Sequence, residues 1–164
     1  MIGTDIEAHY QCTAADYVEA QIAHYRQTRG FYFLIIGGAI GILFGAFMVV
    51  RNGLGTGVPL LLLGAFWWSY FLIIPIWARR DFRKHPNLSR EYLLHANEDG
   101  IQMKSDVSQG GGQWSVYTKY RETKSLFMLY CGARLFFMIP KRAFAHTQEQ
   151  QFRELLRRKL PAAK

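Results

Sequence analysis

Two long apolar blocks, separated by a short loop, constrain this chain more than any other feature. Residues 31–50 contain no charged side chain, and neither do residues 54–77. About 20 consecutive apolar residues make a helix long enough to cross the ~30 Å hydrocarbon core of a bilayer. We therefore expect a transmembrane helical hairpin over residues 30–78, with spans at about 31–50 and 58–77. The alternative is a helical hairpin buried in a soluble core.

A signal peptide is a further alternative for the first block. The thirty residues before it are polar and include several acids, among them Asp5, Asp16 and Glu19. A signal peptide has instead a basic N-terminal region and a shorter apolar segment. The membrane-spanning interpretation is therefore favoured.

Basic residues flank the two blocks unevenly, which predicts an orientation. The loop between the blocks carries only Arg51. The basic residues on the other side are Arg26, Arg29, Arg79, Arg80, Arg83 and Lys84. Because cytoplasmic segments are enriched in Lys and Arg, we expect a multi-pass protein of the cell (inner) membrane with both termini in the cytoplasm.

The formal net charge of +8 raises the question of a nucleic-acid partner. Four of the basic residues, however, directly follow the second block: Arg79, Arg80, Arg83 and Lys84. Basic clusters at this position set the topology and attract anionic lipid headgroups. We therefore expect membrane lipid, and no nucleic acid, as a partner of this cluster.

Glycines recur at every fourth position of the first block. Gly37, Gly41 and Gly45 therefore share one helical face, and small residues at this spacing let two membrane helices approach closely. The partner helix is either the second block or the same helix of another copy, which would give a homo-oligomer. Both remain open from the sequence.

The rest of the chain indicates an α+β architecture. Residues 1–29 are expected to form an N-terminal cytoplasmic strand and a helix, with Thr13 and Asp16 as a capping box at the helix start. Residues 88–160 are expected to form a small antiparallel β-rich cytoplasmic module capped by a C-terminal helix. Whether the N-terminal strand joins that module stays open.

Local signals place the elements of this module. The strands are expected at 91–96, 101–105, 113–120, 126–130 and 135–139, with Asp99-Gly100 as a hairpin turn and the glycines 110–112 as a flexible link. Thr147 and Gln150 form a second capping box, which predicts a helix start there. His85-Pro86-Asn87 should end the helix of the second block.

The run Ile-Pro-Lys-Arg-Ala-Phe at 139–144, the pair Asp16-Tyr17 and Trp114 resemble the YcxB-like family of bacterial membrane proteins. The resemblance implies a polar N-terminal segment, two spans and a strand-rich module that is similar to bacterial pleckstrin-homology-like (PH-like) domains. It implies location and architecture rather than a reaction, because such domains usually bind partners or assemble.

Lys141 and Arg142 are the most suggestive polar pair, since they lie between an apolar strand and the last helix. They are candidate partner-binding residues; the alternative is a turn whose exposed side chains happen to be basic. The two cysteines, Cys12 and Cys131, and the five histidines lack the spacing of a metal site. No phosphate-binding loop or GxSxG element occurs either, so we expect no catalytic residue, no metal, no cofactor and no enzyme.

The leading hypothesis is a membrane-anchored, non-enzymatic interaction or assembly module, which binds a protein partner on the cytoplasmic side or forms a homo-oligomer. The alternative is an oligomeric pore or transport subunit assembled through the glycine face of the first span. Transport proteins usually carry charged or readily ionised groups at mid-membrane depth, and neither block contains an Asp, Glu, His, Lys or Arg. An enzyme of unknown type is the third hypothesis.

Overall fold

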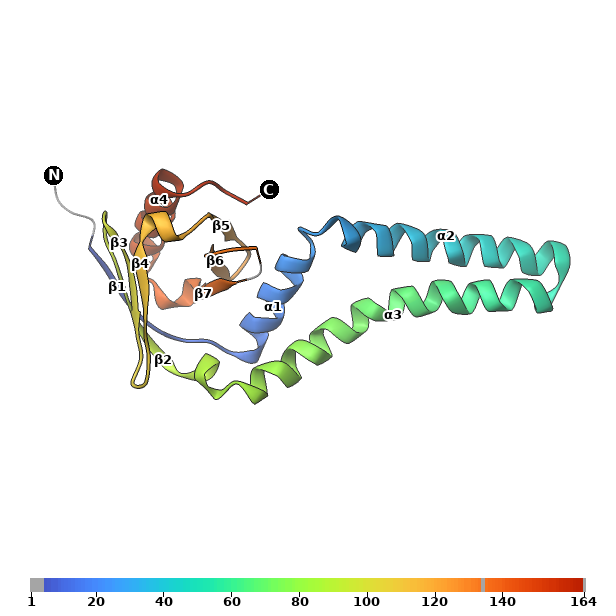
Figure 1. Cartoon of the computed structure of the whole chain (residues 1–164), viewed down its shortest axis with the longest axis horizontal. Coiled ribbons are helices and arrows are strands. Elements are labelled where there is room, and N and C mark those ends of the chain that lie inside the picture. Colours follow the sequence, from blue (N-terminus) through green and yellow to red (C-terminus); the bar gives the residue numbers. More distant parts are fainter. Residues whose placement is uncertain (1–4, 134, 164) are drawn as a thin grey trace. The chain divides into compact units, whose positions relative to one another are not determined.

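The computed structural model describes residues 5–133 and 135–163 and divides into two compact units (Figure 1). The helical unit is Gln21–Arg80. The β unit combines Met1–Ala20 with Asp81–Lys164, so it contains chain from both sides of the helical unit. The predicted α+β class is confirmed, since helices and antiparallel sheets are both present.

Two long helices make up most of the helical unit: α2 (Arg29–Asn52) and α3 (Leu54–Lys84). A single residue, Gly53, separates them, and its φ of 86° lies in the left-handed region that glycine adopts without strain. Both helices are long and apolar enough to cross a membrane. Only 11 % of the most apolar window of α2 is buried, and 18 % of that of α3.

The first sheet of the β unit contains β1 (Ile6–Gln11), β2 (Glu91–Ala96), β3 (Gly100–Lys104) and β4 (Gln109–Gln113), antiparallel in that order. The register of β1 on β2 runs from Ile6 opposite Ala96 to Gln11 opposite Glu91. The N-terminal strand therefore joins the later sheet. The alternation of apolar and polar residues in β1 explains this, because Ile6 faces the core while its neighbour Glu7 faces solvent.

The second sheet contains β5 (Lys119–Glu122), β6 (Leu126–Tyr130) and β7 (Phe136–Pro140), again antiparallel in order. All five residues of β6 are buried, as expected for the central strand of a covered sheet. The last helix, α4 (His146–Lys159), buries Phe152, Leu155 and Leu156. The rings of Phe152 and Phe127 lie 5.3 Å apart, so α4 packs on β6.

Shorter helices connect these elements: α1 (Ala14–Tyr25), η1 (Pro86–Ser89), η2 (Trp114–Val116) and η3 (Lys141–Ala143). As predicted, α3 ends at Lys84, directly before His85-Pro86-Asn87. The predicted capping box at the start of α1 is confirmed as well. Thr13 donates its backbone N–H to the Asp16 carboxylate, and the N–H of Asp16 in turn donates to Thr13 Oγ1, at 2.7 and 3.3 Å.

The predicted strand at 113–120 is wrong. The chain forms β4 up to Gln113 and then turns through η2, so that the buried Trp114 ring can donate its indole N–H to the Asn97 carbonyl at 2.9 Å. The glycines 110–112 are part of β4 rather than a flexible link. A Cβ on Gly111 would lie 2.2 Å from the Ile101 carbonyl oxygen, so glycine allows β4 to approach β3 here.

The predicted capping box of Thr147 and Gln150 is also wrong. The helix begins two residues earlier, where Gln148 Oε1 accepts a hydrogen bond from the N–H of Ala145 at 3.2 Å. The physical reason is tertiary, because Phe144 is buried against Phe152 with ring centroids 4.9 Å apart. The chain therefore turns into the helix directly after Phe144.

Candidate functional site

An ion pair joins α1, which precedes the helical hairpin, to η3, which lies near the end of the chain. Arg142 donates two hydrogen bonds to Asp16, from Nη1 to Oδ1 at 2.8 Å and from Nη2 to Oδ2 at 2.6 Å. Arg142 Nη2 also donates to the carbonyl of Gln11 at 2.8 Å. The Asp16 side chain is 5 % exposed and that of Arg142 is 50 % exposed. This bidentate pair, which we call the α1 latch, fixes the start of α1, which belongs to the β unit, on the C-terminal part of that unit.

Burial of Asp16 raises its pKa, but the hydrogen bonds from Arg142 and Thr13 outweigh burial and hold this pKa below its usual range. Asp16 is therefore a carboxylate at neutral pH. Glu19, one turn further along α1, accepts from the backbone N–H of Ser125 at 3.1 Å and from its hydroxyl. This face of α1 thus contacts the turn between β5 and β6 through Glu19 and Ser125, and it contacts η3 through Asp16 and Arg142. Ala20, on the next turn, is fully buried.

Lys141, the other candidate partner-binding residue, also lies in a charged cluster of the β unit. Its Nζ donates to Glu122 Oε1 at 2.6 Å, and Arg153 Nε donates to both oxygens of the same carboxylate at 2.9 and 3.1 Å. The two cations lie on Phe127, at 5.2 and 5.7 Å from the ring centroid. Burial raises the pKa of Glu122, and the hydrogen bonds from Arg153 and Lys141 reverse this shift and lower it.

Lys141 and Arg142 therefore hold the β unit together, and they differ in what they leave accessible. The Lys141 side chain is 17 % exposed, whereas half of the Arg142 side chain faces solvent. Their role in partner binding stays a prediction.

The glycine face of α2 packs against α3 within the helical unit. A Cβ on Gly41 would lie 3.2 Å from Gly64 Cα, and one on Gly45 would lie 2.7 Å from the backbone nitrogen of Leu61. A Cβ on Gly37 would lie 2.5 Å from the Trp67 ring. All three glycines thus lie at the contact between the two helices, where close packing stabilises a pair of apolar helices.

The four basic residues after the second apolar block, Arg79, Arg80, Arg83 and Lys84, form the last turns of α3 and are exposed. None of them forms an ion pair with another described residue. Asp81, which lies among them, accepts a hydrogen bond from the hydroxyl of Tyr17 at 2.6 Å.

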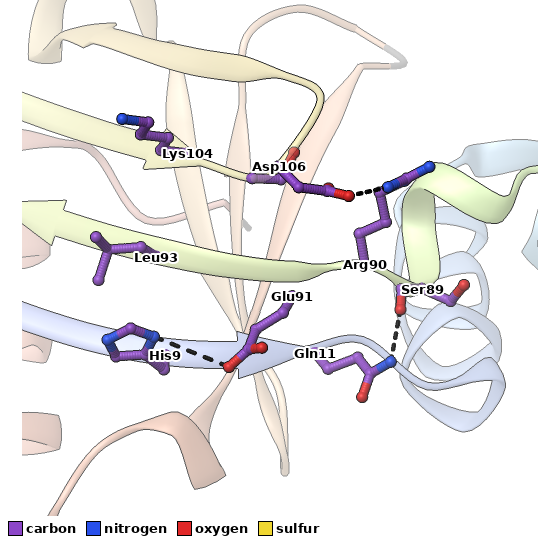
Figure 2. Close-up of a pocket in the computed structure, with 9 residues that line it drawn as sticks. His9, Gln11, Ser89, Arg90, Glu91, Leu93, Lys104 and Asp106 are labelled. Carbon is purple, nitrogen blue, oxygen red and sulfur yellow. Dashed lines mark hydrogen bonds and ion pairs between the residues drawn. The ribbon is translucent and has the colours of Figure 1, made fainter.

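An open hollow of about 470 Å³ lies on the exposed face of the first sheet (Figure 2). We call it the sheet pocket. It is lined by His9 and Gln11 of β1, residues 89–91 and Leu93 around the start of β2, and residues 104–106 at the end of β3.

Polar contacts shape the walls of the sheet pocket. Gln11 Nε2 donates to the carbonyl of Ser89 at 2.6 Å, which ties β1 to the residue that leads into β2. Arg90 pairs with Asp106 across the pocket end, as the dashed line in Figure 2 shows. Within residues 5–133 and 135–163, no group of three or more His, Cys, Asp or Glu side chains is arranged to hold a metal ion.

The run Ile-Pro-Lys-Arg-Ala-Phe forms the end of β7, η3 and the start of the turn into α4, and Trp114 is the buried residue that opens η2. Both carry the resemblance proposed from the sequence. Residues 96–156 match the family model for YcxB-like proteins. The resemblance is confirmed over this segment. No curated protein and no solved structure matches the chain.

The YcxB-like segment runs from the end of β2 into α4 and includes Lys141 and Arg142. It does not include β1, Asp16 or either long helix. The α1 latch thus joins the YcxB-like segment to a part of the chain outside the family match.

Sequence reasoning identified Arg142 as a candidate, but it took Asp16 as a helix cap and as part of the family resemblance and did not connect the two residues. The two residues are 126 positions apart, so no local pattern connects them. A buried acid needs a cation, but the burial of Asp16 is known only from the structure, so the sequence held no signal for this pair. The sheet pocket was missed because three separate segments line it.

Proposed function

We propose that this chain is a membrane-anchored, non-enzymatic interaction or assembly module. In this proposal the α2–α3 hairpin is the anchor, and the β unit is the cytoplasmic part that binds a protein partner or another copy. The observation that carries the proposal is the large apolar surface that α2 and α3 leave uncovered.

Most large apolar side chains of the two helices are exposed, including Phe33 at 79 %, Val50 at 88 % and Leu72 at 72 %. Soluble monomers rarely expose a continuous apolar patch larger than a few hundred Å². A helical hairpin in a soluble core would bury most of these side chains, whereas lipid tails cover them in a bilayer at no cost. The exposure therefore favours insertion over the soluble alternative.

The pairing of β1 with β2 supports a hairpin whose two ends lie on the same side of the membrane. β1 precedes the hairpin and β2 follows it, and they share a sheet from Ile6 opposite Ala96 to Gln11 opposite Glu91. An even number of spans between them meets this requirement. The exposed cations of the cluster Arg79, Arg80, Arg83 and Lys84 favour the cytoplasm as that side, through the positive-inside rule and attraction to anionic headgroups.

The arrangement of the β unit supports the likeness to PH-like domains. Four antiparallel strands are followed by three, and a C-terminal helix packs on the second sheet. This is a fold-level analogy and does not by itself assign a function. It favours binding or assembly, and Arg142, whose guanidinium already holds Asp16 and the Gln11 carbonyl, still leaves half of its side chain exposed to a partner.

The alternative of an oligomeric pore depends on the glycine face of α2. In the structure that face contacts α3, since the positions that approach Gly41 and Gly45 belong to Gly64 and Leu61. A second copy would have to use another face of α2. The pore therefore has no structural observation in its favour.

Cysteine accessibility in intact cells tests the anchor. A single cysteine replaces Asn52, at the end of α2, or Asn97, in the turn after β2, in a background without Cys12 and Cys131. We expect a membrane-impermeant maleimide to label position 52 in intact cells and position 97 only after permeabilisation. Labelling of position 97 in intact cells would show that the topology is the reverse of the one proposed. Protection of both positions, with the protein recovered in the soluble fraction, would contradict the anchor.

Crosslinking mass spectrometry on intact membranes at native expression tests the interaction role. We expect crosslinks from the β unit to another protein or to a second copy, and fewer of them in a variant with Arg142→Gln. Recovery of the monomer alone, together with a purified protein that turns over substrates of a hydrolase and transferase panel, would overturn the non-enzymatic assignment.

A further inference from the structure

We propose that β4 is a dimerisation edge, at which two copies of this chain join their first sheets. The two β4 strands pair antiparallel about a two-fold axis beside Gly111, so that two four-stranded sheets become one continuous sheet. This inference rests on the assembly role proposed above, and it names the surface and the partner. It does not depend on the membrane anchor.

The outer edge of β4 is open. β4 is the last strand in the order of the first sheet (Figure 1), and within residues 5–133 and 135–163 no strand pairs with it on the side away from β3. Natural proteins protect edge strands with charged residues, with proline or with cover from another segment. β4 contains only Gln and Gly, and four of its five residues are exposed. None of these protections is present in the strand itself.

The β5 edge of the second sheet is covered, in contrast, by the last residues of the chain. Tyr120 N–H donates to the carbonyl of Pro161 at 3.0 Å, and Ala163 N–H donates to the carbonyl of Tyr120 at 2.7 Å. Ala162 forms a parallel bridge with Tyr120. The chain thus covers β5 with its own tail, whereas the backbone of β4 remains open to a second chain.

The strand register determines which backbone groups of β4 point outward. Opposite residues of an antiparallel ladder alternate between hydrogen-bonded and non-hydrogen-bonded pairs. Ser105 N–H donates to the carbonyl of Ser108 at 2.7 Å, which makes these two residues a hydrogen-bonded pair, and the same register continues along β3 and β4. Alternate residues of β4 therefore direct their N–H and C=O groups away from β3, and these are Gln109, Gly111 and Gln113.

This edge is complementary to itself. The sequence of β4, Gln-Gly-Gly-Gly-Gln, reads the same in both directions. When Gly111 lies opposite Gly111 of a second copy, each Gln109 lies opposite a Gln113, and all the residues with outward groups face one another. A two-fold axis requires this reciprocity. A shift of two residues would leave one such residue of each β4 without a partner strand residue, so the symmetric register forms the most hydrogen bonds.

Exposed apolar side chains lie at both ends of β4. Val107, in the turn before β4, is 57 % exposed, and Val116, in η2 after it, is 52 % exposed. A Cβ on Gly112 would lie 3.1 Å from Val116 Cγ2, so Val116 lies against the end of the strand. An antiparallel pair places the start of one β4 beside the end of the other. Val107 of each copy then comes close to Val116 of the other, which removes apolar surface from water.

Disulfide trapping in the full chain tests the register. Single cysteines replace Gln109 or Gln113 in a background without Cys12 and Cys131, in two differently tagged copies that are expressed together, and isolated membranes are mildly oxidised. In the proposed pair, positions 109 and 113 have Cα atoms about 5.5 Å apart, within disulfide range, whereas two copies of the same position are at least about 13 Å apart. We expect a disulfide between Gln109→Cys and Gln113→Cys. Neither variant should crosslink with itself, nor should Gln150→Cys, an exposed control on α4. Equal trapping of position 109 with itself would overturn the register.

Charges at the two glutamines test the same contact by sedimentation equilibrium of the full chain in detergent micelles. Lys104 lies opposite Gln109 within the sheet, so position 109 takes the acid in both variants. Gln109→Glu with Gln113→Glu places like charges opposite each other across the dimer and should raise its Kd by roughly fivefold. Gln109→Glu with Gln113→Lys places opposite charges there and should not raise the Kd. Equal Kd values for the two variants would place the dimer contact elsewhere and refute the proposal.

The outcomes separate this inference from the proposed function. If the chain crosslinks to another protein in intact membranes but forms no disulfide between positions 109 and 113, the β4 dimer is wrong and the interaction role stands. A disulfide from Gln109→Cys to a different protein would show that the edge binds a foreign strand, and the second copy would be the wrong partner. A disulfide between positions 109 and 113 in protein recovered from the soluble fraction would support the dimer and contradict the anchor.

Discussion

Replacing Arg142 by Met removes the cation of the α1 latch while keeping a long side chain at that position. Exposed ion pairs contribute about 0.2–1 kcal/mol to stability, whereas removal of one partner of a buried pair costs about 3–5 kcal/mol. The latch lies between these limits, because the Asp16 side chain is 5 % exposed and that of Arg142 is 50 % exposed. We therefore expect the free energy of unfolding of the β unit to fall by about 2 kcal/mol.

For a unit of about 100 residues, 1 kcal/mol corresponds to a change in Tm of about 4–8 °C, so Arg142→Met should lower Tm by about 8–16 °C. The assay is differential scanning calorimetry of the full chain in detergent micelles. The matched control is Arg157→Met, which removes an exposed cation of α4 that pairs with no described residue. Surface substitutions of that kind change stability by less than about 0.5 kcal/mol.

A double-mutant cycle with Asp16→Asn separates the ion pair from other effects of Arg142. If the pair carries the stability, the two substitutions together should cost clearly less than the sum of the single costs. The reasoning is refuted if Arg142→Met has the same Tm as Arg157→Met. It is also refuted if the stability costs of Arg142→Met and Asp16→Asn simply add in the double mutant.

Three further results are expected from other parts of the molecule. Gly45→Leu should separate α2 from α3 and lower the stability of the hairpin by about 1–3 kcal/mol, measured by spin-label distances between the helices, whereas Gly55→Leu should change nothing because no atom lies within 4 Å of its Cβ position. The lowered pKa of Glu122 contributes stability that is present above the unfolded-state pKa of about 4.3 and is lost as the pH falls through the folded-state pKa, so Tm should drop less on acidification in Glu122→Gln than in the wild type. Burial raises the pKa of Cys12 to about 12, so mass spectrometry should find Cys131 alkylated at least roughly tenfold faster than Cys12 at pH 7.5; equal rates would contradict the burial of Cys12.

Local patterns in the sequence determined those features that depend on residues close together in the chain. The uncharged blocks became α2 and α3, the capping pair Thr13 and Asp16 starts α1, and His85-Pro86-Asn87 ends α3. Hydrophobic runs likewise predicted the strands of the second sheet that became β6 and β7. In each case the signal and the structure that it forms lie within a few residues, so propensity, capping and hydropathy suffice.

Local patterns failed where a distant contact decides the conformation. The glycines 110–112 were expected to be a flexible link, yet the close approach of β3 orders them as β4. α4 starts two residues before its predicted start, because Phe144 is buried against Phe152. In both places a contact with another element outweighs the local preference, as is usual for weak propensities.

Only the tertiary structure could decide how the ends of the chain meet. β1 could pair with the edge of any of several apolar strands. The strand that it does pair with, β2, lies about 80 residues further along the chain. The latch between Asp16 and Arg142 and the sheet pocket depend on that pairing, because it brings the segment before the helical hairpin into the β unit. Charge and hydropathy act between side chains wherever they lie in space, and the sequence alone does not state which distant side chains become neighbours.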